Sequence, residues 1–211
     1  EPRILNLQPP PELQGPVQEN YLQLLGKLNR DHFLQHPREL DLQARLANLE
    51  LATQMQSAAQ EALDLGRETK ATHRMYGMDN PATQEFGARC LIARRLVERG
   101  VRFVQLFTKN QYWDHHGSIQ TRLPESTMKI DQPAAALVKD LKQRGLLDST
   151  VVHWGGEMGR LPVIQNDTGV ANFGRDHNTY GFSMWVAGGG FKAGGTYGET
   201  DEFGHRAVEK I

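Results

Sequence analysis

Three short segments combine carboxylate and imidazole side chains with glycine. They are residues 113–117 (Trp-Asp-His-His-Gly), 155–160 (Gly-Gly-Glu-Met-Gly-Arg) and 174–178 (Gly-Arg-Asp-His-Asn). Carboxylate and imidazole are ligands that Zn, Mn, Mg or Fe accept, and a pair spaced like Asp114 and His116 can reach one ion from a loop. If the three segments meet in the folded chain, they predict a metal centre.

Each candidate residue also has a structural interpretation. Asp114 is typical of a turn residue that caps the following element, and His177 is also compatible with a core histidine bonded to its neighbours. Glu157 has less packing reason to stand between Gly-Gly and Met-Gly, and glycine permits a close backbone approach to a ligand, so we predict that it binds metal. Arg160 is either a solvated cation or a bidentate partner for the oxygens of an anionic substrate.

The elements that must position these segments are short strands and long helices. The apolar runs 101–107, 150–154 and 182–187 indicate buried strands, and residues 124–144 indicate a helix that starts at a proline and ends before Gly145. Strand, long helix and strand form a βαβ unit, whose two strands are parallel. We therefore predict an α/β fold with a mostly parallel sheet flanked by helices, and a ligand site beyond the carboxyl ends of its strands.

Prolines and helical periodicity divide the chain into three parts. Residues 1–16 hold five of the ten prolines and indicate an extended linker. Residues 17–99 indicate a helical segment, with a hairpin turn near residues 36–37 and a last helix ending at Gly100. Residues 100–211 form the predicted α/β part that carries the site. The chain has no initiator methionine, and we expect it to be part of a longer protein.

Composition limits the classes of partner. The chain has 211 residues, 38% of them hydrophobic, and 24 basic against 25 acidic residues, so we expect a globular protein that does not bind nucleic acid. A single cysteine excludes an internal disulfide framework. No apolar stretch approaches the length of a membrane span. Trp113, Trp154 and Trp185 lie at or beside the predicted strand ends, where they are expected to line a pocket or the core.

The order of several motifs resembles a known bacterial family. These motifs are Phe-Val-Gln-Leu at 103–106, the three segments above, Asp-Gln-Pro at 131–133, the run at 140–148 (Asp-Leu-Lys-Gln-Arg-Gly-Leu-Leu-Asp) and Thr-Asp-Glu-Phe-Gly at 200–204. Together they are similar to the family called domain of unknown function 1501, over essentially the whole chain. That family is sulfatase-like and is placed in the alkaline phosphatase superfamily.

The resemblance implies a site as well as a fold. It implies that Asp114, His116, Glu157 and His177 are metal ligands, with His115 a variable position, and that the ions are divalent, with Zn, Mn, Mg or Ca as candidates. The superfamily nucleophile and its first metal-binding aspartate are expected outside this chain. Superfamily members often have Asp-His where this chain has Glu157-Met158, so one expected ligand is missing. The resemblance also implies export to an extracytoplasmic location, although no leader is present in this chain.

These features predict a metal-dependent hydrolase of phosphate or sulfate esters. Arg160 and Arg175 would bind the negative charge of the substrate, which is a small anionic ester or a sulfated or phosphorylated polymer. The alternative is a sulfatase-like scaffold without catalysis that serves as a binding or assembly module for a protein or polysaccharide.

Overall fold

The computed structural model describes residues 10–37, 40–109, 111–165 and 172–209. Contacts within the chain divide it into two compact units, residues 1–67 and 68–211. The helical segment predicted over residues 17–99 is thus distributed over both units. The candidate site residues all belong to the second unit.

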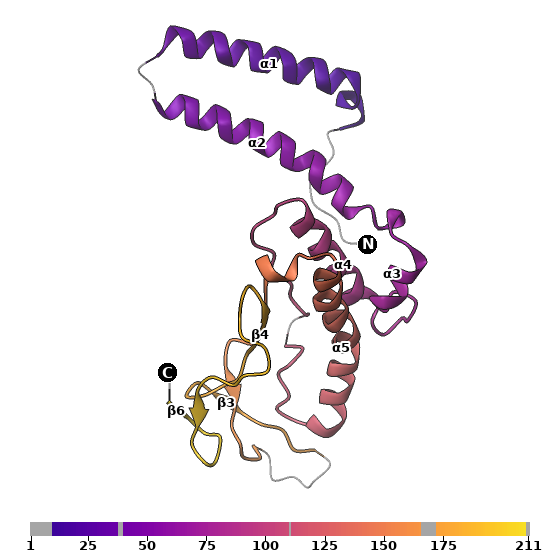
Figure 1. Ribbon diagram of the computed structural model, residues 1–211, viewed down its shortest axis with the longest axis vertical. Helices are drawn as coiled ribbons and strands as arrows, with labels where there is room; N and C mark the ends of the chain where they lie inside the picture. Colours follow the sequence, from indigo (N-terminus) through magenta and orange to yellow (C-terminus); the bar gives the residue numbers. More distant parts are fainter. Residues whose placement is uncertain (1–9, 38–39, 110, 166–171, 210–211) are drawn as a thin grey trace. The chain divides into compact units, whose positions relative to one another are not determined.

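The first unit is a helical hairpin. Helices α1 (Pro16–Gln35) and α2 (Leu40–Leu63) run side by side in opposite directions (Figure 1), flanked by the 3-10 turns η1 (Pro11–Leu13) and η2 (Leu65–Arg67). Pro16 opens α1, since a proline at the first helical turn sacrifices no hydrogen bond, and Pro37 follows its end. Of the linker predicted over residues 1–16, residues 1–9 lie outside the described residues.

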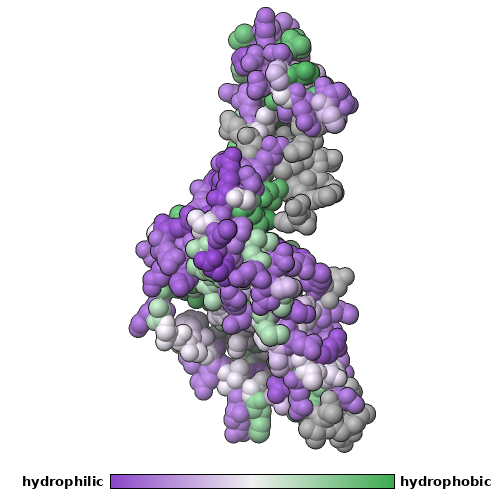
Figure 2. Space-filling model, turned by 90° about the vertical axis from the view of Figure 1, so that its right-hand side faces the viewer, coloured by the Kyte–Doolittle hydropathy of each residue, from purple (hydrophilic) through white to green (hydrophobic). Residues whose placement is uncertain are grey.

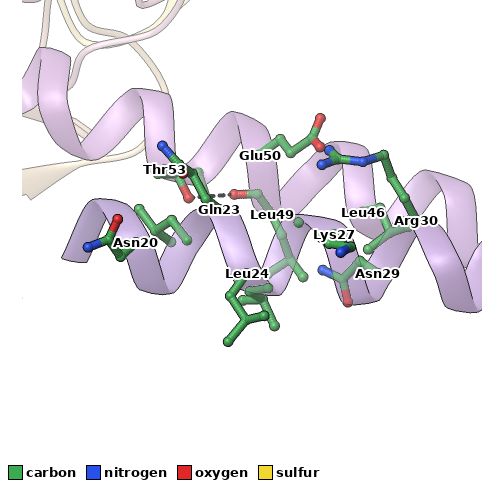
Figure 3. Close-up of a pocket in the computed structure, with 14 residues that line it drawn as sticks. Asn20, Gln23, Leu24, Lys27, Asn29, Arg30, Leu46, Leu49, Glu50 and Thr53 are labelled. Atoms are coloured by element: carbon green, nitrogen blue, oxygen red, sulfur yellow. Dashed lines mark hydrogen bonds between the residues drawn. The ribbon is translucent and has the colours of Figure 1, made fainter. Parts of the chain in front are cut away.

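The surface of the hairpin includes apolar side chains. Several leucines are more than half exposed, among them Leu24, Leu28, Leu34 and Leu49. Figure 2 shows such hydrophobic residues as patches on a mainly hydrophilic face. A groove of about 970 Å³ lies between the two helices and is lined by residues of both, including Gln23, Arg30, Leu46 and Thr53 (Figure 3). None of the predicted site residues lines it.

The second unit has a core made mainly by two helices. Helix α4 (Gln84–Glu98) packs against α5 (Ile119–Gln143), and α3 (Lys70–Met75) lies at their side. Cys90 and Leu91 of α4 and Ile130 and Leu141 of α5 are buried. Helix α4 ends at Glu98, just before Gly100, where the sequence predicts the end of the last helix. Helix α5 begins five residues before the predicted start at Pro124, so that both Pro124 and Pro133 lie inside it.

The strands are short and pair only antiparallel. Strand β1 (Val151–Trp154) pairs with β4 (Trp185–Gly188), β2 (Gly159–Arg160) with β3 (His177–Asn178), and β5 (Glu199–Thr200) with β6 (Ala207–Glu209). A 3-10 turn, η3 (Leu147–Ser149), leads from α5 into β1. The predicted α/β fold with a mostly parallel sheet is therefore wrong: the described chain is mainly helical, with three small two-stranded sheets.

The error began with the run 101–107. It has no regular secondary structure, and its aromatic side chains Phe103 and Phe107 are 80% and 65% exposed. A short apolar run has the composition of a strand, but its periodicity does not identify a pairing partner. Strand β1 instead finds its partner in β4, an apolar run that returns in the opposite direction, so no βαβ unit forms.

Long apolar helices of the membrane-spanning kind are not found in the part of the chain that the structure describes.

Candidate metal centre

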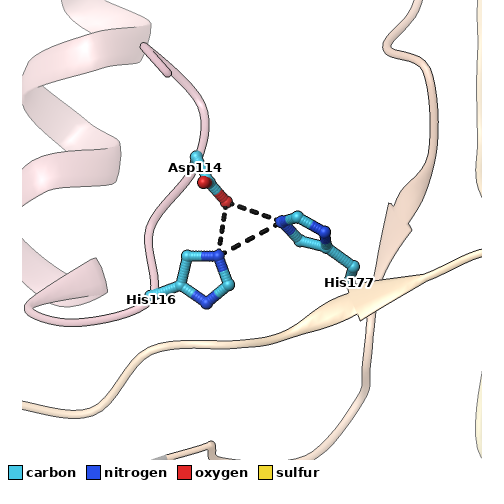
Figure 4. A group of neighbouring side chains, drawn as sticks. All are labelled: Asp114, His116 and His177. Carbon is cyan, nitrogen blue, oxygen red and sulfur yellow. Dashed lines mark hydrogen bonds and ion pairs between the residues drawn. The ribbon is translucent and has the colours of Figure 1, made fainter.

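Two imidazoles and one carboxylate meet in the second unit. The Oδ1 atom of Asp114 lies 2.8 Å from Nε2 of His116 and 2.9 Å from Nε2 of His177, and the two Nε2 atoms are 3.2 Å apart (Figure 4). Four-coordinate zinc with ligands at 2.0–2.1 Å would separate neighbouring ligand atoms by about 3.3 Å. The triangle is therefore slightly smaller than the face of a tetrahedral metal site. We call Asp114, His116 and His177 the triad.

A tightly turned loop supplies Asp114 and His116. The amide of Asp114 donates to the carbonyl of Gln111 across 3.2 Å, and the loop ends at Ser118, the residue that precedes α5. Gln111 and Ser118 both have positive φ angles, of 50° and 53°, a conformation that is uncommon outside glycine. The loop between them thus bends at both ends.

A two-stranded ribbon supplies the third residue of the triad. His177 of β3 stands directly opposite Arg160 of β2. Because opposite residues of an antiparallel pair extend their side chains on the same face, both reach the same carboxylate. The guanidinium of Arg160 donates to Oδ1 of Asp114 at 2.6 Å, the atom that also contacts His177.

The two loops lie in direct backbone contact. The amide of Arg175 donates to the carbonyl of His115 at 3.1 Å, and the amide of Ile119 donates to the carbonyl of Phe173 at 3.0 Å. A Cβ atom on Gly174 would overlap the backbone of His116 and Gly117. Glycine at position 174 therefore allows the loop that carries His177 to lie against the loop that carries His116.

Both ring nitrogens of His116 have an oxygen neighbour. Nδ1 lies 2.6 Å from Oε1 of Gln165, and Nε2 lies 2.8 Å from Oδ1 of Asp114. With the proton on Nδ1, the hydrogen bond to Gln165 would leave the lone pair of Nε2 for a metal ion. Histidine ligands of metals are commonly oriented in this way, by an acceptor on the other ring nitrogen.

Neighbouring positive and polar groups keep Asp114 ionised. The hydrogen bond with His177, followed by the hydrogen bond and charge of Arg160, lowers the pKa of Asp114 against the opposing effect of burial. A carboxylate has about four lone-pair positions, so it can accept from Arg160 and still bind a cation. The side chain is 19% exposed, which leaves access to the site.

The side chain of His115 is buried and is not part of the triad. It is only 5% exposed, and neither ring nitrogen has a hydrogen-bond partner within the described residues. Burial, and then the charges of Arg122 and Arg160, lower the pKa of His115, so the ring is neutral. We therefore assign it to the packing of the loop rather than to the triad.

The remaining predicted site residues lie outside the triad. Among the described residues, the group of ligand atoms within 4.8 Å of one another contains the triad and does not include Glu157, which is exposed in the turn before β2. Its role as a ligand stays a prediction. Arg175 is exposed as well, and its guanidinium has no ion pair among the described residues. Arg160 binds Asp114 rather than standing free for a substrate.

Sequence reasoning missed the residues that hold the triad together. Gln165 lies outside the three quoted segments, and only the folded structure brings it to His116. Gly174 was part of a quoted motif, and a glycine beside Arg-Asp-His is a signal of close backbone approach that could have been used.

Comparison with known proteins identifies one relationship. The sequence model of the family described as "Protein of unknown function (DUF1501)" matches residues 1–211. Neither a curated protein nor a solved structure matches the chain. The family resemblance seen in the sequence is thereby confirmed, whereas the relationship to sulfatases stays a prediction.

Proposed function

The chain belongs to the DUF1501 family, whose function is unknown, and from its site we propose that it is a metal-dependent hydrolase of phosphate or sulfate esters. One observation carries the proposal. One oxygen of a carboxylate and one nitrogen of each of two imidazoles lie within 4.8 Å of one another, although Asp114 and His177 are 63 residues apart in the sequence. Such convergence, with an oxygen of Gln165 on the other ring nitrogen of His116, favours coordination over a chance cluster of polar side chains.

The proposal gives each residue a role. Asp114, His116 and His177 would hold a divalent ion, and two imidazoles favour Zn or Mn over Mg and Ca, which prefer oxygen ligands. Such an ion would polarise an ester oxygen and lower the pKa of a bound water. Arg175 would neutralise the anionic ester, and Arg160 would do so with the guanidinium N–H groups that Asp114 does not use. Glu157 is retained as an additional proposed ligand.

The test is hydrolysis of aryl phosphates and aryl sulfates by the metal-free full-length protein, with Zn, Mn, Mg or Ca added one at a time. We expect turnover that depends on one of the first two metals and is lost in Asp114→Asn, which keeps the size of the side chain but removes its charge. Glu125→Asn, on an exposed position of α5, is the matched control and should retain turnover. Equal turnover in Asp114→Asn would refute the assignment.

A second candidate function is a binding or assembly module without catalysis. The observation in its favour is that one oxygen of Asp114 already pairs with Arg160 and with both histidines. This alternative predicts that the protein purifies without stoichiometric metal. It also predicts that no ester in the panel is hydrolysed.

The proposal also covers the substrate and the cellular location. We expect a small anionic ester or a sulfated or phosphorylated polymer as the substrate, and an extracytoplasmic location. Fractionation of cells that produce the full-length protein tests the location.

A further inference from the structure

Four aromatic rings form a row that begins beside the triad. Tyr112 contacts Trp113 edge to face, with ring centroids 5.2 Å apart, and Trp113 contacts Trp154 in the same manner at 6.2 Å. Trp154 and Trp185 are stacked, with centroids 6.4 Å apart and planes within 11°. Since Trp113 immediately precedes Asp114, the row leads from the triad to the β1–β4 sheet.

The last two rings are open to solvent. Trp154 and Trp185 are each 40% exposed, and they are opposite one another in the final pair of the β1–β4 register. Leaving part of a large aromatic side chain in water forgoes the free energy of burying it, and exposed apolar patches commonly mark binding sites. The pair thus presents two nearly parallel indole rings beside the candidate site.

We propose that Trp154 and Trp185, continued by Trp113, form a stacking platform for a sugar ring of the esterified substrate. This inference rests on the proposed function, because it identifies the part of the substrate that carries the ester. The face of a pyranose ring presents C–H groups that pack on an indole, while its hydroxyl groups remain in water. The ester group of such a sugar would extend past Trp113 towards the triad and Arg160.

The size and charge of the platform favour a sugar over larger or charged partners. At about 3.3 Å per residue and about 4.8 Å between strands, two strands of four residues cover roughly 13 by 10 Å, far below the ~800 Å² per partner of a stable protein interface. Single-stranded nucleic acid also stacks on aromatic rings, but it needs a basic groove. Neither β1 nor β4 contains a lysine or arginine.

The chain connects the platform to the triad. Strand β1 ends at Trp154, and six residues later Arg160 of β2 contacts Asp114. A Cβ atom on Gly155 would lie 2.8 Å from Cγ of Met184, so the turn after Trp154 lies close to the residue before Trp185. This contact supports a fixed relation between the two tryptophans and the start of the site.

The test measures binding rather than turnover. The full chain is titrated with a neutral oligosaccharide, the same oligosaccharide bearing sulfate esters, an aryl sulfate and a short oligonucleotide, and both tryptophan fluorescence and calorimetry are recorded. We expect both oligosaccharides to quench the fluorescence, and the sulfated one to bind more tightly. Trp185→Ala should weaken binding about tenfold, as expected for the loss of a stacking contact. Trp185→Tyr should restore most of it.

Two controls separate the platform from the metal site. Phe203→Ala removes another exposed aromatic side chain, which has no ring contact among the described residues, and it should leave binding unchanged. Circular dichroism checks that Trp185→Ala is folded; if it is not, Trp185→Leu, which keeps a large apolar side chain but has no ring face, carries the test and should bind as weakly. Asp114→Asn should lose metal but keep its affinity for the neutral oligosaccharide.

The outcomes distinguish the two proposals. If the oligosaccharides bind but the protein holds no metal and hydrolyses no ester, the platform stands and the proposed function fails. If aryl esters are hydrolysed but no oligosaccharide binds, the platform alone is refuted. Binding of the oligonucleotide only, or tryptophan fluorescence that neither the ligands nor acrylamide quench, would also overturn it, because the rings would then serve another partner or be covered.

Discussion

Gln165 supports the ring of His116 from the side opposite the triad. Gln165→Leu removes the acceptor at 2.6 Å from Nδ1, so the ring loses the hydrogen bond that would orient Nε2, the proposed ligand atom. Removal of such a supporting hydrogen bond typically weakens metal binding about 10–100-fold. Competition with a zinc chelator measures the change. Gln143→Leu, at an exposed position of α5, is the control and should bind as the wild type does; equal affinity of both variants would contradict the role assigned to Gln165.

Gly174 is required for the close approach of the two ligand loops. A side chain at this position would overlap the backbone of His116 and Gly117, so Gly174→Ala must push the loops apart. We expect a loss of roughly 1–3 kcal/mol in the free energy of unfolding, as for other overpacked sites. Weaker metal binding should accompany it. Gly156→Ala is the matched control, since its Cβ would meet nothing closer than 3.7 Å.

The measurement for Gly174→Ala is a urea titration followed by zinc competition on the folded protein. A variant as stable as the wild type that binds zinc equally well would show that the loops do not need this contact.

At the scale of elements, a buried arginine joins α4 to α5. The guanidinium of Arg94 contacts Asp140 of α5 at 2.9 Å, Glu68 at 2.8 Å and Glu98 at 2.6 Å, and its side chain is 2% exposed. Arg94→Met leaves these carboxylates with Arg95 and Arg144 as partners. Removing one member of a buried ionic group typically costs about 3–5 kcal/mol, and we expect the lower end here.

Urea denaturation with an unchanged m value measures this loss. Arg89→Met of the same helix is the control: its pair with Glu85 is exposed, so its loss should cost about 1 kcal/mol or less. Similar losses in the two variants would refute the role assigned to the buried arginine.

The helices could be predicted from the sequence, but the pairing of strands could not. Pro16, Pro37 and Gly100 punctuate long apolar periodicities, and such local signals determine where α1 and α4 begin or end. The antiparallel pairing of β1 with β4 depends on contacts between distant residues, and nothing in the run 101–107 revealed that it would remain outside a sheet. The ends of helices are therefore local information, whereas the formation and pairing of strands are not.

The site was partly predictable for the same reason. Residue type and spacing identified the segments that contain Asp114, His116 and His177, because metal ligands come from a small set of side chains, and the family resemblance singled out these residues within them. The contact of Arg160 with Asp114 depends on the register of β2 and β3, and the contact of Gln165 with His116 depends on how two loops meet. The spacing of residues in the sequence does not predict either contact.

At the scale of the whole molecule, acid should destabilise the fold. Burial by itself raises the pKa of Glu68, but hydrogen bonds and charge from Arg94 and Arg95 outweigh it, so the net pKa is lowered. A carboxyl group whose pKa is lowered in the folded state stabilises the fold fully at a pH above its ordinary pKa of 4.5. This stabilisation is lost as the pH falls below 4.5 and through the lowered pKa of the folded state.

Urea titrations between pH 7 and pH 3 measure the dependence. In Glu68→Gln we expect lower stability at pH 7 and a shallower decline below pH 4.5, the ordinary value of the replaced group. Glu125→Gln should leave the decline unchanged. An identical decline in Glu68→Gln and the wild type would exclude Glu68 as a contributor.

The metal content of the purified full-length protein tests the central claim most directly. Mass spectrometry of the native protein, with elemental analysis, should find about one zinc or manganese ion per triad. His177→Gln should lose it, and His153→Gln, which alters a histidine outside the triad, should retain it. A folded wild-type protein that stays free of metal after incubation with both ions, or a His177→Gln variant that keeps the full amount, would contradict the account.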